Sequence, residues 1–190
     1  MIPNELIELI DEYKTPIVKD KRWGFDLEEK EFIKGMCLLT PQAYGSRIES
    51  RMAEYTNMKK VSSRKSKGDC VTSNGHYVEN KGSIITTTNP FLNLVQIRVF
   101  HEIEYYFCQA FDVRDLDNYT SYYFVLTHDE MLEECKNAGN AHGTKKVNKE
   151  NTNVEKRMSI LVDKNDATFK RWCDKYRVDT LEEVKTILNS

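Results

Sequence analysis

Three charged side chains lie close together in the stretch "GDCVTSNGHYVENKGSII", residues 68 to 85. Asp69 precedes one run with strand character, Glu79 and Lys81 lie in a second run, and Asn74-Gly75 lies between the runs. Asn-Gly is the favoured two-residue hairpin turn, and residues two apart on a strand point to the same face. Two carboxylates and an ammonium on neighbouring strands are groups that could bind a divalent cation and act on a phosphate ester.

The chemistry of such a site follows from the ligands that Mg²⁺ prefers. The ion takes hard oxygen ligands, commonly one or two carboxylates together with phosphate oxygens and water. Asp69 and Glu79 could converge on one ion, and the backbone carbonyl of Asn80 could supply a third oxygen. Lys81 could then orient or deprotonate a water molecule directed at phosphorus.

A Glu-x-Lys pair by itself has little meaning, because the sequence contains five of them. They begin at Glu12, Glu28, Glu79, Glu134 and Glu183. Four lie in helical patterns, where residues two apart do not face each other, so we expect both partners to meet solvent. Only Glu79 lies in a β-patterned run that follows an aspartate, which favours this pair as the functional one.

These residues resemble the PD-(D/E)XK nuclease superfamily, and most closely type II restriction endonucleases. The resemblance covers residues 40 to about 127 and implies a restriction-endonuclease-like core, a central mixed sheet flanked by helices. It implies that Asp69 and Glu79 bind Mg²⁺, that Lys81 assists the attacking water, and that Glu49 on the preceding helix supports the metal site. Gly68 is a departure, because the family pattern has proline before the aspartate.

Each of these residues also has an ordinary structural interpretation. Asp69 could be a plain turn residue, and Glu79 with Lys81 could be an exposed pair worth under about 1 kcal/mol. Glu49 could be a solvent-facing or salt-bridge residue, and Gln96, which follows in the stretch "LVQIRVFHEIEYYF", is interpreted as structural.

The charge distribution points to a polyanionic partner. The formal net charge is −2, yet residues 58 to 68 hold five basic residues and no acidic one, and residues 136 to 157 hold six basic against two acidic. Lys contacts phosphate or guanine, and Asn can read adenine, although a polar surface loop explains the second segment equally well. The candidate DNA-binding residues are Lys59, Lys60, Arg64, Lys65, Lys67, Arg98, His142, Lys145, Lys146, Asn148 and Asn151.

Periodicity and capping signals predict an α+β (mixed α/β) chain of 190 residues. We expect helices over 4–13, from an N-cap at Asp26 to Met36, from Thr40-Pro41 to about Tyr55, from Thr127, and over about 166–176 and 180–188. We expect strands over 69–73, 76–87, 105–112, 122–126 and 157–162, with 92–97 a strand or the start of a helix. As a single domain, the chain divides into an N-terminal helical part (1–39), a catalytic core (40–127) and a helical part (128–190) with a candidate recognition loop over 139–157.

The sequence therefore predicts a Mg²⁺-dependent endonuclease of double-stranded DNA, a sequence-specific type II restriction enzyme. We expect a homodimer, because two strands require two active sites. The alternatives are a related phage or repair nuclease, a non-catalytic DNA-binding module of the same fold, and a structural α+β protein with incidental charges.

No apolar run approaches a membrane span, and five widely spaced cysteines favour reduced thiols, so we expect a cytoplasmic protein.

Overall fold

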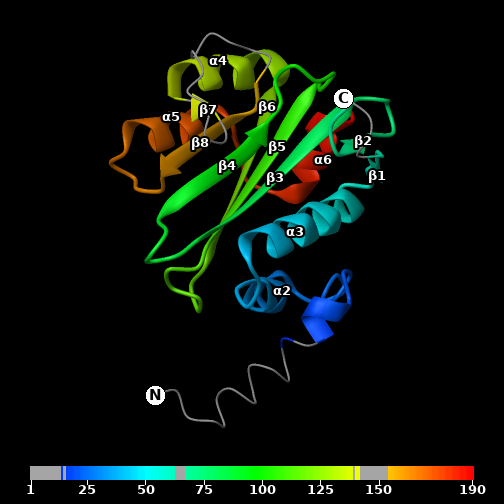
Figure 1. The fold of residues 1–190 in the computed structure, drawn as a ribbon, viewed down its shortest axis with the longest axis vertical. Helices are drawn as coiled ribbons and strands as arrows, with labels where there is room; N and C mark the ends of the chain where they lie inside the picture. Colours follow the sequence, from blue (N-terminus) through cyan, green and yellow to red (C-terminus); the bar gives the residue numbers. More distant parts are fainter. Residues whose placement is uncertain (1–13, 15, 63–66, 139, 142–153) are drawn as a thin grey trace.

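The computed structural model describes residues 14, 16–62, 67–138, 140–141 and 154–190. They form a mixed α+β fold, in which a central mixed sheet is flanked by helices (Figure 1). The expectation of this fold class is confirmed. The predicted helix over 4–13 lies outside the described residues.

The central sheet has six strands in the order β1-β2-β3-β5-β6-β9. β3 and β5 run parallel along their whole length, and every other neighbouring pair is antiparallel. The strands are β1 (Lys59–Lys60), β2 (Cys70–Val71), β3 (Tyr77–Ile85), β5 (Tyr105–Asp112), β6 (Thr120–Thr127) and β9 (Arg177–Val178).

A second sheet contains β4 (Phe91–Ile97), β8 (Lys156–Leu161) and β7 (Asn140–Ala141), in the order β4-β8-β7. Residues 92–97, expected to be a strand or the start of a helix, form a strand. Parallel strands are usually joined by a helix, but the connection from β3 to β5 passes through β4 of this second sheet. The second sheet was not expected from the sequence.

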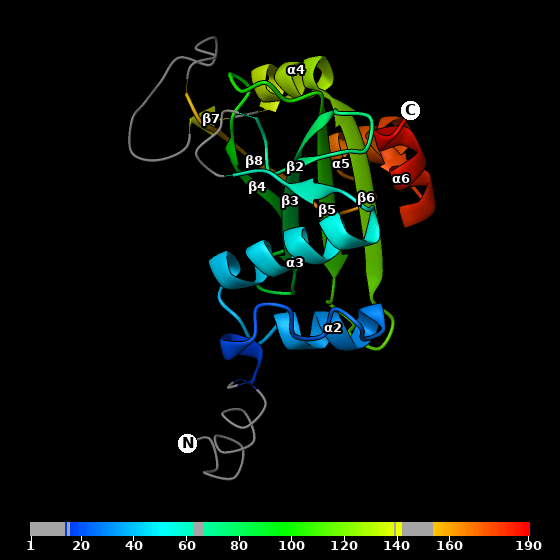
Figure 2. The same cartoon turned by 90° about the vertical axis from the view of Figure 1, so that its right-hand side faces the viewer.

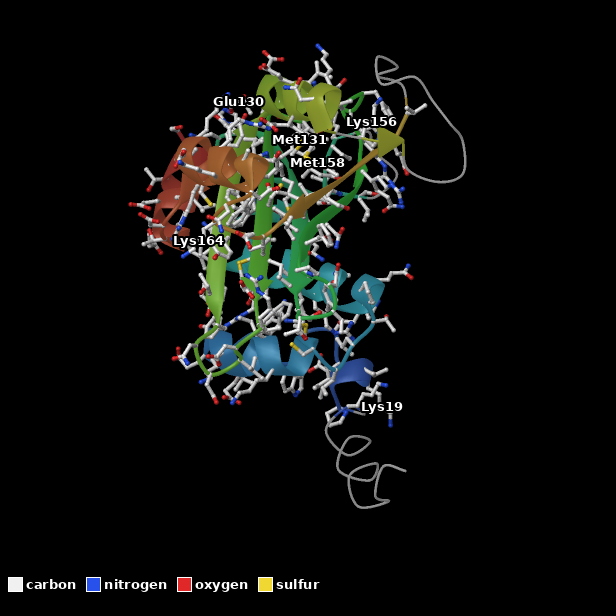
Figure 3. All side chains as sticks on the ribbon, turned by 90° about the vertical axis from the view of Figure 1, so that its left-hand side faces the viewer. Lys19, Glu130, Met131, Lys156, Met158 and Lys164 are labelled. Atoms are coloured by element: carbon white, nitrogen blue, oxygen red, sulfur yellow. The ribbon has the colours of Figure 1, made fainter. Side chains whose placement is uncertain are left out.

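Helices cover both faces of the central sheet. α2 (Glu29–Met36), α3 (Pro41–Tyr55) and α6 (Leu181–Leu188) share one apolar core with one face of the sheet. α4 (His128–Ala138) and α5 (Ala167–Lys175) share a second core with the other face and with the second sheet. Figure 2 shows α3 crossing the strands with α2 beside it, and Figure 3 shows Met131 of α4 near Met158 of β8.

None of the helices in the described part of the chain combines the length and apolar character that crossing a membrane requires.

Most helix starts follow their local signals. α3 begins at Pro41, directly after Thr40. Thr127 and Glu130 form the expected reciprocal cap of α4, with the Thr127 backbone N–H donating to Glu130 Oε2 at 3.0 Å. The expected N-cap at Asp26 is wrong, because α2 begins after Glu28.

The hairpin between β2 and β3 has a longer loop than predicted. The Thr72 N–H donates to the His76 carbonyl at 2.9 Å, so Ser73, Asn74 and Gly75 form the connection rather than Asn74-Gly75 alone. β2 is also short, and it pairs with β3 only at Cys70↔Val78 and Val71↔Tyr77. β2 does not pair with the rest of that edge of β3, which we call the open edge.

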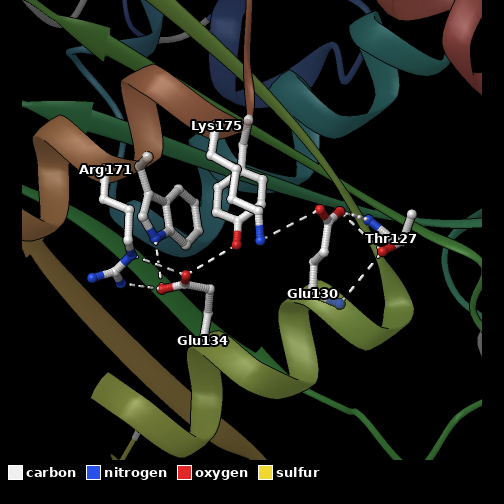
Figure 4. A network of polar contacts seen from close by, with 7 residues as sticks. Thr127, Glu130, Glu134, Arg171 and Lys175 are labelled. Atoms are coloured by element: carbon white, nitrogen blue, oxygen red, sulfur yellow. Dashed lines mark hydrogen bonds and ion pairs between the residues drawn. The ribbon is translucent and has the colours of Figure 1, made fainter.

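Glu134 contradicts the expectation that the other Glu-x-Lys pairs meet solvent. Its carboxylate on α4 is buried and accepts hydrogen bonds from Arg171, Trp172 and Tyr176 at 2.5–3.3 Å (Figure 4). These donors come from α5 and the residue that follows it, so the network joins the two helices. Glu183 also has a structural role, because it caps α6 reciprocally with Thr180.

Candidate active site

The open edge of β3 is where the predicted site residues meet. The Asp69 N–H donates to the Val78 carbonyl at 3.0 Å, and the Asn80 N–H donates to Asp69 Oδ2 at 3.1 Å. These two bonds fix the Asp69 carboxylate beside β3, just beyond the last residue that pairs with β2. The N–H and C=O of one strand residue point to the same side, so the Asn80 carbonyl is directed to the edge where Asp69 lies.

The backbone conformation of Gly68 accounts for the presence of glycine, rather than proline, before the aspartate. Its φ is +66°, and a Cβ at this position would lie 2.8 Å from the Val78 carbonyl oxygen. Proline fixes φ near −65°, so it cannot adopt this backbone conformation. The tight approach to Val78 instead requires glycine.

Glu79 and Lys81 share one face of β3 and form a buried ion pair. Lys81 Nζ donates to Glu79 Oε1 at 2.6 Å. The Lys81 side chain is 12% exposed and the Glu79 side chain is 2% exposed. The alternative of an exposed surface pair is therefore wrong. Burial raises the pKa of Glu79, and the nearby Asp69 carboxylate raises it further, against the opposing effect of Lys81.

Glu49 reaches this edge because α3 packs directly against β3. A Cβ on Gly82 would lie 2.8 Å from Ile48 Cγ2, so the glycine permits the close contact that brings the next helical residue, Glu49, to the site. Glu49 and Lys81 line a cavity of about 440 Å³ between α3, β3 and β4. Burial, followed by the Asp69 carboxylate, raises the pKa of Glu49 to about 7, while Lys81 opposes the shift.

The electrostatics favour one of the two roles considered for Lys81. Burial lowers the pKa of Lys81, but the carboxylates of Glu79, Asp69 and Glu49 outweigh it and raise the pKa above its ordinary value. The side chain is therefore an ammonium ion. An ammonium can orient a water molecule or a phosphate oxygen, whereas deprotonating a water molecule requires the neutral amine.

The donor set fits a hard divalent cation held by few protein ligands. Within the described residues no group of three or more His, Cys, Asp or Glu side chains is arranged to hold a metal ion. Asp69, Glu79 and the Asn80 carbonyl are oxygen donors of the kind that Mg²⁺ takes, and the ion commonly completes such a set with water and phosphate oxygens. The Asn80 side chain is buried, and its amide nitrogen donates to Cys70 Sγ at 3.5 Å.

Asn93 and Gln96 of β4 also line this cavity. Asn93 was not expected there, and the sequence indicates a structural role for Gln96. The pairing of β4 with β8 shifts register between Leu94 and Ile97, and Gln96 has a φ of +53° at this irregularity. Positive φ is uncommon outside glycine, and bulges often lie beside active sites. No local pattern of residue types marks the bulge, so the sequence carried no signal for it.

The structure places four of the candidate DNA-binding residues. Lys59 and Lys60 are exposed on β1, Lys67 pairs with Glu102 at 3.2 Å, and Arg98 pairs with Glu155 at 2.9 Å. Arg98 lies near the site, because Glu79 and Asp69 contribute to its raised pKa after the larger effects of Glu155 and burial. The remaining candidates lie outside the described residues: Arg64, Lys65, His142, Lys145, Lys146, Asn148 and Asn151.

Comparison with known proteins finds no family model that matches the chain and no curated protein that matches it.

Proposed function

We propose that this protein is a Mg²⁺-dependent endonuclease that hydrolyses phosphodiester bonds of double-stranded DNA, with a restriction-endonuclease-like core and the activity of a type II restriction enzyme. The observation that carries the proposal is the meeting of Asp69, Glu79, Lys81 and Glu49 at one open strand edge beside a cavity. These residues are the ones on which the resemblance to PD-(D/E)XK nucleases rests. We further propose a cytoplasmic homodimer that obtains sequence specificity from residues 139–157, a segment expected to be a loop throughout, although Asn140–Ala141 form β7 and Lys156 begins β8.

The roles follow from the chemistry of each group. Asp69, Glu79 and the Asn80 carbonyl would hold Mg²⁺, which when bound neutralises charge that develops on the phosphate. The Asn80 N–H orients the Asp69 carboxylate. Glu79 holds the Lys81 ammonium at the same edge, where the ammonium positions the attacking water. Glu49 adds a further carboxylate from α3 on the cavity side.

The alternatives are a related phage or repair nuclease and a non-catalytic DNA-binding module of the same fold. One observation favours the non-catalytic DNA-binding module. Lys81 already donates to the Glu79 carboxylate, so a bound cation would have to share this carboxylate with the ammonium. The two carboxylates and the lysine are nevertheless all present at the edge, which favours an enzyme.

A metal-dependence assay tests the proposal. Purified protein is incubated with phage and plasmid DNA in Mg²⁺, in Ca²⁺ and in EDTA. Discrete fragments in Mg²⁺ alone support a restriction enzyme, and a smear in Mg²⁺ alone indicates a nonspecific nuclease. Binding without cleavage in every condition indicates a non-catalytic DNA-binding module. Full activity in EDTA would show that cleavage does not require a metal ion.

A further inference from the structure

A second and larger cavity lies next to the candidate active site, along helix α3. Its volume is about 830 Å³, and Gln42 and Ser46 line both this cavity and the smaller one that contains Glu49 and Lys81. The two hollows therefore meet across the first half of α3. A chain-like ligand bound at the candidate site could continue into the larger hollow without leaving the protein surface.

The larger cavity is lined mainly by positive charge. Its charged residues are Lys21, Arg22, Arg47 and Lys60 against a single carboxylate, Glu54, which gives four positive and one negative charge, or a balance of +3. Glu54 is itself engaged by Arg22 at 2.7 Å. A groove with this balance attracts a polyanion.

Two of these basic residues, Arg47 and Lys60, are held by neutral partners that leave their charge uncompensated. Arg47 is buried and donates to the carbonyls of Ile17 and Ala43 at 2.9–3.0 Å, which are neutral partners. Lys60 donates to the Ser50 hydroxyl on α3, so its ammonium lies over the helix. Lys60 also contributes to the pKa of Glu49, which places it near the candidate active site.

Gly45 is a second, independent sign of a ligand. It lies inside α3 and lines the smaller cavity, where glycine destabilises a helix relative to alanine. A Cβ on Gly45 would meet no atom within 4 Å, so no packing within the described structure requires glycine here. Glycine also occurs where a ligand approaches the backbone closely.

We propose that the sugar–phosphate backbone of a DNA strand crosses α3 at Gly45 and Ser46 and continues along the basic cavity past Lys60 and Lys21. The inference rests on the proposed function, because it takes the scissile phosphate to lie at the edge marked by Asp69 and Glu79. It adds the direction in which the strand leaves that edge, and it assigns α3 as the surface over which the strand runs.

Two neighbouring lysines, Lys59 and Lys60, allow a direct test of the proposed strand path. Lys59 precedes Lys60 on β1, and successive strand residues point to opposite faces. Of these two lysines, Lys60 lines the larger cavity and Lys59 does not. Lys60→Ala should therefore weaken DNA binding more than Lys59→Ala does, although both variants lose one exposed positive charge.

The first experiment measures the binding of a labelled 30-base-pair duplex by fluorescence anisotropy in Ca²⁺, over a range of salt concentrations. The double variant Lys21→Ala/Lys60→Ala should bind on the order of tenfold more weakly at moderate salt, and its salt slope should fall by about two, since each phosphate contact contributes about one. The control is Lys164→Ala/Lys170→Ala, which loses the same charge on the β8–α5 side of the molecule (Figure 3). This control should bind as the parent does.

The second experiment replaces the glycine. Gly45→Ala should raise the melting temperature by about 2–4 °C through helix propensity, yet weaken binding of the same duplex severalfold, because the methyl group obstructs the strand. The exposed α4 substitution Asn137→Ala is the matched control, which should leave DNA affinity unchanged. A Gly45→Ala protein that is more stable and binds DNA as tightly as the parent would overturn the crossing at Gly45.

The outcomes separate this inference from the proposed function. If the double lysine variant keeps the parental affinity and salt slope while the parent cleaves DNA in Mg²⁺, the strand path is wrong and the nuclease proposal stands. If the parent cleaves nothing but its binding depends on Lys21 and Lys60, the strand path stands and the nuclease proposal fails. If the parent binds no duplex at all, both are overturned.

Discussion

At the scale of single residues, the decisive groups are Asp69, Glu79 and Lys81. Asp69→Asn, Glu79→Gln and Lys81→Met should each lower the cleavage rate by at least about 100-fold, because each change removes a ligand charge or the ammonium that positions water. These shape-conserving variants should remain folded by circular dichroism. Groups that act as a unit are not additive, so double variants should be little worse than single ones. The exposed Glu28→Gln is the control, and a folded Glu79→Gln protein with the parental rate would refute the assignment.

Glu49 gives a prediction that does not depend on activity. Because burial raises its pKa from 4.5 to about 7, the folded protein holds this proton more tightly than the unfolded chain. The stability contributed by that proton is present below about pH 4.5 and is lost as the pH rises through 7. Glu49→Gln should therefore be more stable than the parent at pH 8, on the order of 1–3 kcal/mol after allowing for solvent screening of a half-buried group, and similar to it at pH 4.5. Urea unfolding at the two pH values measures this, and a less stable variant at pH 8 would contradict it.

At the scale of elements, the turn into β2 depends on Gly68. Gly68→Pro introduces a residue that cannot adopt a φ of +66°. It should therefore lower the free energy of unfolding and displace Asp69, so that cleavage is lost as well. Gly68→Ala should cost on the order of 1–3 kcal/mol through the strained φ and the contact with Val78. Gly75→Ala is the comparison, because its φ is +91° but a Cβ there meets no atom within 4 Å. Chemical denaturation that ranks Gly75→Ala as the more damaging change would show that the Val78 contact is unimportant.

The attachment of α5 to α4 depends on Glu134. Its loss leaves buried donors of Trp172 and Tyr176 without their acceptor, together with the guanidinium of Arg171. Glu134→Ala should therefore cost about 3 kcal/mol or more, seen as a lower melting temperature. The neighbouring Glu133 is exposed on the same helix, so Glu133→Ala should change the melting temperature little. Equal melting temperatures for the two variants would mean that the network contributes nothing to stability.

At the scale of the whole molecule, the proposed cleavage of both strands requires two active sites. Sedimentation analysis should give twice the mass of the chain, and supercoiled plasmid should convert to the linear form without accumulating the nicked form. Variants of Lys21 and Lys60 serve as the control, because they should slow both cuts equally without changing the sedimenting mass. A monomer that accumulates nicked plasmid would contradict the dimer and would favour a nuclease that cuts single strands.

The sequence by itself determined the features that depend on neighbouring residues. Proline at position 41 starts α3, the Thr127 and Glu130 pair caps α4, and alternation along β3 sends Glu79 and Lys81 to one face. These features arise from bonds and steric limits within a few residues of chain, so residue types and spacing are enough to predict them.

Only the tertiary structure decided which of these residues are buried and what lies opposite them. Glu79 and Glu134 begin the same Glu-x-Lys pattern, yet Glu79 faces a lysine at an open strand edge and Glu134 joins two helices. The approach of Glu49 depends on Gly82, 33 positions later, and the second sheet joins β4 to a strand more than 50 residues further on. Such contacts depend on how distant segments pack, and the packing free energy of those segments is not encoded in any local pattern.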